Sequence, residues 1–108
     1  ESMTEESKKI LVEKLKQKLN ITWNDEKTDR KLSDIVSDAE AVMNHKLGAE
    51  IDYSAPESGI GRTLFINYCV YAWNDCENEF DDAYREMILM ARAFYEVKGH
   101  EGQDQGTE

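Results

Sequence analysis

The segment from Leu64 to Tyr84, LFINYCVYAWNDCENEFDDAY, decides the fold of this chain. As far as Trp73 it places apolar and aromatic side chains around the whole circumference of a helix, and an acidic run then follows at once. A helix that is apolar on every side must be covered on every side. Because a chain of 108 residues has few internal surfaces to offer, we expect contacts with other copies or other proteins.

The start of the chain predicts an amphipathic helix over residues 4–19, ended by Asn20, because Leu11, Leu15 and Leu19 repeat every four residues. This helix also carries a cluster of lysines. The cluster is either a solvated helix face or a docking patch for an acidic partner or a phosphate backbone. Its members are Lys8, Lys9, Lys14, Lys16 and Lys18.

A second helix is predicted to end at about Leu47, because Gly48 stands at the position just past a helix end where glycine is favoured. Trp23 lies in the connector before this helix and is expected to pin the corner. The core-facing stripe of the helix follows helical spacing and consists of Leu32, Ile35, Val36, Ala39, Met43 and Leu47.

A third helix is predicted to start at Ser54, because the segment SAPE at 54–57 has the order of a capping box, with an early proline and an acid three residues after the serine. Gly59 and Gly61 weaken its first turns, so regular helix is expected only from Arg62. The two glycines are either a hinge or places where another backbone comes close. From this helix we assign to the core Leu64, Tyr68 and Tyr71.

The last helix has a core-facing stripe at i, i+4, i+7, i+8 and i+11 spacing. The stripe consists of Phe80, Tyr84, Met87, Ile88, Ala91, Phe94 and Tyr95. Further apolar residues are left over on other faces, and we expect them to contact neighbouring subunits: Leu89, Met90, Ala93 and Val97. Because residues 74–79 contain no glycine or proline, this helix either continues the third one or is separated from it by a kink.

Residues 99–108, GHEGQDQGTE, are rich in glycine and contain no apolar residue, so we expect a tail that is disordered in isolation. The sequence therefore predicts one helical domain over residues 4–98 and a flexible C-terminal tail over residues 99–108. The fold class is all-α, a small bundle of about four helices with a long apolar third helix.

The composition limits the classes of function. The formal net charge of -10, from 23 acidic and 13 basic residues, argues against a protein that grips phosphates. The acidity serves either solubility or a surface that repels or mimics DNA. The longest apolar run is too short to cross a bilayer, and residues 1–9 lack the apolar core of a signal peptide, so we expect synthesis in a cytoplasm without export.

Residues that bind metals or catalyse reactions do not form a recognisable motif. Cys69 and Cys76 lie seven apart on the predicted third helix, too far for a disulfide, and with His45 and His100 they lack the spacing of a zinc site. Reduced thiols are expected. The acidic run lacks the oxygens and glycine of a calcium loop, and no phosphate loop, GxSxG or HExxH motif occurs. We expect no enzymatic activity and no cofactor.

Over nearly its whole length the chain resembles the small head-tail connector (adaptor) proteins of long-tailed bacteriophages and prophages. Two motifs are the parts most alike. The first is LNITWNDEKTD, residues 19–29, at the entry to the second helix. The second consists of Asn67, Tyr68, Tyr71, Ala72, Asn74 and Phe80. Gly59 and Gly61 depart from the family pattern.

The resemblance implies a helical bundle whose copies form a closed ring beneath the portal protein. Such a ring extends the DNA channel and provides a platform for the stopper or tail-completion protein. DNA would pass without specific binding along a wall of acids, here Glu77, Glu79, Asp81 and Asp82. The tail would order on the portal through Gly99, His100, Gln103 and Gln105. The expected location is the head-tail junction of the virion, and the host cytoplasm during assembly.

A second hypothesis stays open, a small acidic helical regulator or inhibitor that mimics DNA or occupies a partner's helix groove. The two hypotheses differ in symmetry. A regulator should be a monomer or dimer with its acids on one convex face, whereas a connector should form closed rings on its portal.

Overall fold

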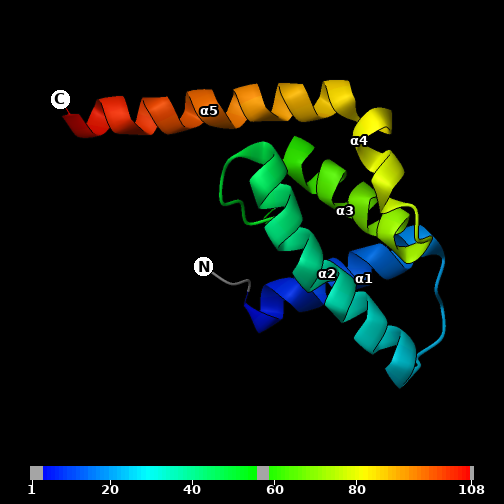
Figure 1. The fold of residues 1–108 in the computed structure, drawn as a ribbon. Coiled ribbons are helices and arrows are strands. Elements are labelled where there is room, and N and C mark those ends of the chain that lie inside the picture. Colours follow the sequence, from blue (N-terminus) through cyan, green and yellow to red (C-terminus); the bar gives the residue numbers. More distant parts are fainter. Residues whose placement is uncertain (1–3, 56–58, 108) are drawn as a thin grey trace.

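The computed structural model of the chain describes residues 4–55 and 59–107, with side chains described as far as residue 97. These residues form five α-helices and one short 3-10 helix, and none of them lies in a β-strand. The prediction of an all-α protein is confirmed, although the number of α-helices is five rather than about four. In chain order (Figure 1) the elements are α1 (Glu5–Leu19), α2 (Glu26–Leu47), α3 (Ile60–Trp73), η2 (Glu77–Glu79), α4 (Phe80–Ala83) and α5 (Arg85–Thr107).

The first two helices end where the sequence predicted, because local capping groups determine their boundaries. Thr4 before α1 and Asp25 before α2 each accept, through a side-chain oxygen, a hydrogen bond from the backbone N–H three residues on. At the other ends, Asn20 has φ 61° and Gly48 has φ 70°. Both residues adopt the left-handed conformation that lets the backbone N–H bond back to the last free carbonyls of a helix.

The third helix starts later than the capping-box pattern predicted. Its first residue is Ile60, and Gly59 precedes it with φ 52° and no side chain to cap the helix. Ser54 belongs to a turn instead, since its backbone N–H lies 3.1 Å and its hydroxyl 2.6 Å from Asp52 Oδ1. The carboxylate two residues earlier thus takes the donors of the serine, and the predicted helix start at Ser54 is wrong. Residues 56–58 lie outside the described part of the chain.

The third and last helices are not continuous. α3 ends at Trp73, and Asp75 then adopts a left-handed conformation with φ 58°. The Cys76 N–H donates to Tyr71 O at 2.9 Å, which is the 6→1 bond of a Schellman motif. With 14 residues, α3 is shorter than α2 with 22 and α5 with 23, so the prediction of a long third helix is wrong.

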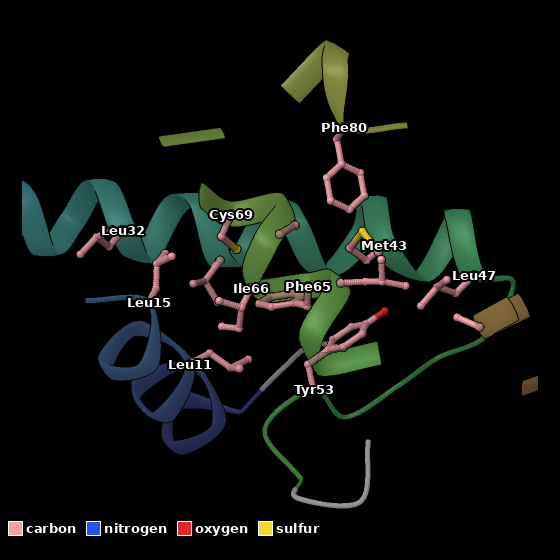
Figure 2. Packing of buried hydrophobic residues seen from close by; sticks show 14 of the residues in the cluster. Leu11, Leu15, Leu32, Met43, Leu47, Tyr53, Phe65, Ile66, Cys69 and Phe80 are labelled. Atoms are coloured by element: carbon pink, nitrogen blue, oxygen red, sulfur yellow. The ribbon is translucent and has the colours of Figure 1, made fainter. Parts of the chain in front are cut away.

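The core lies where α1, α2 and α3 meet, with α5 packed across α2 and α3 (Figures 1 and 2). The predicted core residues that are fully buried are Leu11, Leu15, Leu32, Val36, Ala39, Met43, Leu64, Phe80 and Ala91. Others are only partly buried against this cluster, and these are Ile35, Tyr68, Tyr71, Tyr84, Met87 and Ile88.

The centre of the core also contains residues that the stripes did not predict. Tyr53, from the connector between α2 and α3, stacks on Phe65 of α3 with ring centroids 4.5 Å apart, and both side chains are fully buried (Figure 2). The Tyr53 hydroxyl donates to Asn44 Oδ1 at 2.8 Å, which satisfies the polar end of the ring. By contrast, Trp23 is 54% exposed, so the prediction that it pins a corner is wrong.

The fifth helix continues through Thr107, so the backbone of residues 99–107 is helical where the sequence indicated an irregular tail. No proline interrupts the segment, and each added helical residue gains one backbone hydrogen bond, which offsets the poor helix propensity of its glycines. In Figure 1 this end of α5 projects beyond the other helices.

Candidate functional site

The most distinctive surface feature is a row of apolar side chains on the solvent face of α5, here called the outer stripe. The exposed fractions are 60% for Leu89, 63% for Met90, 49% for Phe94 and 56% for Val97. Ala93 lies between them and is also exposed. Because these residues are spaced by three or four positions, they form one continuous face of the helix. The four predicted contact residues are therefore all on the surface.

The opposite face of α5 holds the helix against the body. Ala91 is fully buried, and Met87, Ile88 and Tyr95 pack partly buried against the core. Arg92 Nη1 donates to Lys46 O at 2.8 Å, which satisfies a carbonyl in the last turn of α2. With one face used in this way, α5 cannot turn the outer stripe inward.

Phe94 belongs to the outer stripe and not to the core-facing stripe in which the sequence placed it. Tyr95 takes the inward position four residues after Ala91. The rings of Phe94 and Tyr95 meet edge to face with centroids 5.0 Å apart. Helical spacing allows either ring to follow Ala91 inward, and the available space beside α3 decides for Tyr95. The exposed apolar face of α5 therefore includes one aromatic ring, that of Phe94.

The predicted channel acids lie on η2 and α4, and all are exposed. Two of them are already paired with cations. Asp81 Oδ1 lies 2.6 Å from Lys46 Nζ, and Asp82 Oδ1 lies 2.7 Å from Arg85 Nη2. Glu77 and Glu79 therefore carry most of the uncompensated charge of this segment. Exposed pairs of this kind contribute little stability.

The negative potential of this segment affects neighbouring side chains. Burial and then the carboxylates of Glu79, Glu77 and Asp75 raise the pKa of the Cys76 thiol. Cys76 lies beyond the end of α3, so it does not share a helix with Cys69 as predicted. Both thiols are free.

A metal site is not formed by the described residues, in which no three His, Cys, Asp or Glu side chains come together as ligands. Cys69 is buried in the core and His45 is exposed on α2. Burial raises the pKa of the Cys69 thiol, which makes it inert rather than nucleophilic.

The proposed portal-docking residues, Gly99, His100, Gln103 and Gln105, all lie in the helical part of α5, and their side chains fall outside the described residues.

The basic cluster of α1 is not uniformly solvated. Lys16 is buried, and its Nζ lies 2.6 Å from Asp29 Oδ1 of α2, so this lysine joins two helices and is not available to a partner.

Sequence reasoning missed a second surface feature, an open groove of about 600 Å³ between α2 and the C-terminal half of α3. Its floor is formed mainly by partly buried apolar side chains, and acids lie along its rim. Ile35 and Tyr68, both predicted as core, are only partly buried because they line this groove, and no pattern in the sequence indicates it.

Within the described residues, none of the helices combines the length and the apolar character that crossing a membrane requires. Comparisons with protein-family models, with curated proteins and with solved structures each found no match.

Proposed function

We propose that this protein is a head-tail connector of a long-tailed bacteriophage or prophage, which assembles into a ring beneath the portal. The observation that carries the proposal is the outer stripe of α5. Contiguous exposed apolar surface of this kind marks a contact surface, since leaving it in water forfeits about 25 cal/mol for each Å² that could be buried. A helix with one apolar face on the core and a second one facing solvent is suited to joining subunits.

The motifs at residues 19–29 and 67–80 supply the link to the connector family. In the structure they are packing elements: Ile21 and Phe80 are buried, and Tyr68 and Tyr71 both contact the Phe80 ring edge to face, with centroids 5.2 and 5.6 Å away. Residues that hold a bundle together are what a structural subunit shares with its relatives. This role needs no catalytic group and no cofactor.

The remaining parts of the proposal follow from this role. The ring joins the portal on one side to the stopper or tail-completion protein on the other, in the host cytoplasm during assembly and then in the virion. DNA passes through it without specific binding. Glu77 and Glu79 suit a wall that repels phosphates, and the projecting end of α5 suits docking on the portal.

The test changes Leu89 and Met90 together to Asp. Two charges in the middle of the outer stripe lose their hydration when a neighbouring subunit covers it, which is unfavourable. The variant should therefore fail to assemble, while its helicity and cooperative melting stay normal. The protein is mixed with the portal encoded beside it, and ring formation is followed by electron microscopy. A matched control, Gln17→Asp with Thr22→Asp, adds the same charge at exposed polar positions and should assemble.

The wild type should close into a ring of about the twelvefold order of a portal rather than into a dimer. At dilute concentration the isolated protein can stay monomeric, since a small contact must overcome at least about 4 kcal/mol of association entropy. Failure of the wild type to form rings on the portal contradicts the connector proposal. Normal assembly of the Leu89/Met90 variant moves the contact to another surface.

The exposed acids of η2 and α4 favour a second candidate, the acidic regulator that mimics DNA. That protein would be a monomer or dimer and would compete with DNA for a DNA-binding partner. Changing Glu79 to Gln should weaken such competition, whereas in a connector it should leave ring formation intact and increase the retention of DNA on the ring.

A further inference from the structure

The groove between α2 and α3 has the form of a receptor for a helix. Its apolar floor includes Ile35 and Val42 on α2, and Tyr68 and Ala72 on α3. Ala41 and Ala72 are small, so a second backbone can approach closely between them. From Ile35 to Val42 the α2 side of the groove is about 11 Å long, at about 1.5 Å per helical residue.

The rim of this groove is acidic. Asp38, Asp75 and Glu77 border it, and all three are exposed. Burial raises the pKa of Tyr68 at the floor, and the carboxylates of Glu77 and Asp38 raise it further. The cation that borders the groove, Lys31, is engaged over the ring of Trp73 at 4.7 Å. An occupant should therefore be apolar at its centre and basic at its edge.

The outer stripe of α5 is apolar along its length and has two arginines on one flank, with one glutamate beside them. From Leu89 to Val97 it is about 12 Å long at the same rise per residue, which matches the apolar part of the groove from Ile35 to Val42; the lining itself extends one turn further, to Lys31. Arg85 and Arg92 flank it on one side and are both exposed; Glu96, also exposed, lies on the same flank by helical spacing, and Glu86 stands one turn before Leu89 and Met90. Each guanidinium has five N–H donors and uses only part of them within its own chain, on Asp82 and on Lys46 O respectively.

The two surfaces cannot meet within one chain. α5 packs on α2 and α3 near Lys46 and Gly61, with the outer stripe turned away, whereas the groove lies along α2 from Lys31 to Val42 and along the C-terminal half of α3. We propose that the outer stripe of α5 docks in the α2–α3 groove of a second copy of this chain. The contact is heterologous, because one surface meets a different surface, and repetition of such a contact produces a ring or a filament.

This inference rests on the proposed function and names the partner surface of the outer stripe. It is tested first by complementation. The groove variant Ala41→Glu keeps its outer stripe, and the variant Leu89→Asp with Met90→Asp keeps its groove. At a protein concentration at which the wild type assembles, each alone should be monomeric by sedimentation, and a mixture of the two should form a 1:1 heterodimer that cannot extend. Ala41→Ser has similar size without charge and should assemble as the wild type does.

A weak contact is captured by cross-linking. Ala41→Cys and Ala93→Cys are made separately in a chain with Cys69→Ala and Cys76→Ala, mixed, and treated with a short bismaleimide. The expected product joins residue 41 of one copy to residue 93 of another, and the Ala93→Cys protein alone should give little dimer. Circular dichroism melting of every variant checks that it folds. Positions 41, 89, 90 and 93 are exposed on helices, and the variants without the buried Cys69 are compared with the chain that carries only Cys69→Ala and Cys76→Ala.

Each result separates the inference from the proposed function. Cross-linking only between two copies of the Ala93→Cys protein would retain α5 as the contact and overturn the groove as its receptor. Normal assembly of the Ala41→Glu variant, or no heterodimer in the mixture, would overturn the groove as well. Absence of every cross-link, with no rings on the portal, would overturn both.

Discussion

The hydroxyl of Tyr95 occupies the space that a side chain at position 61 would need, since a Cβ at Gly61 would lie 2.5 Å from Tyr95 Oη and 3.3 Å from its Cζ. A backbone hydrogen bond links Gly61 to this hydroxyl. Gly61 lies in the first turn of α3, where backbone N–H groups lack partners within the helix. Tyr95 thereby caps α3 from a distant helix and sets how closely α5 approaches the body.

We predict that Gly61→Ala destabilises the protein by about 1 to 3 kcal/mol, the range for overpacking a closed contact, although alanine is the better helix former. In a Tyr95→Phe background the same change should cost much less, because the crowding hydroxyl is gone. Urea unfolding of the four proteins forms the double-mutant cycle. Gly48→Ala is the control. A Cβ at Gly48 would have nothing within 4 Å, but the φ of 70° makes alanine unfavourable there, so its cost should be the same in both backgrounds. Equal costs in both backgrounds would contradict the crowding at Gly61.

A second prediction concerns the core. Leu64→Ala should cost about 2 to 5 kcal/mol, because the side chain is fully buried and its removal leaves a cavity. Ile35 and Ile88 are only partly buried, so their replacement by Ala should cost less than that range. Chemical unfolding at neutral pH measures all three. An Ile35→Ala cost as large as that of Leu64→Ala would place Ile35 in the core after all.

A third prediction concerns the end of α5. Removal of residues 99–108 should lower the helical circular dichroism signal, because α5 continues through Thr107. The melting temperature should stay the same, since the last described side chain of α5 that packs against the core is Tyr95. A lower melting temperature would show that the removed segment packs on the body. If it docks on the portal, the truncated protein should melt normally yet fail to join heads.

A fourth prediction concerns alkaline pH. Burial raises the pKa of the Cys69 thiol well above its ordinary value of 9.0, so the folded state keeps a proton that the unfolded state releases. Stability should therefore fall as the pH rises above 9.0, by up to about 1.4 kcal/mol per pH unit from this group. Burial of Tyr53 acts in the same direction above pH 10.0.

The variant Cys69→Ala isolates the thiol contribution. It should be less stable than the wild type at neutral pH, because a buried side chain is truncated, yet lose less stability between neutral pH and pH above 9.0. Urea midpoints at the two pH values measure the difference. Parallel losses in both proteins would show that the thiol does not titrate on unfolding.

The candidate interface was predictable in large part because it depends on local periodicity. Leu89, Met90, Ala93 and Val97 fall on one face of a helix whose other face is filled, and their spacing alone shows this. Phe94 was misplaced because it and Tyr95 are adjacent aromatic residues, either of which continues the inner stripe. The groove was missed because it is a relation between α2 and α3, and no pattern within one helix contains it.

The sequence by itself determined the class of fold, the course of α1, the end of α2 and the two apolar faces of α5. Capping groups at Thr4, Asn20 and Gly48 and the spacing of leucines act within a few residues, so they can be read from the chain. The tertiary structure alone decided which aromatic residues fill the centre, since Tyr53 and Phe65 are selected by the space between three helices. It also decided how closely α5 approaches the first turn of α3, because the hydroxyl of Tyr95 meets Gly61 from a residue more than thirty positions away in the chain.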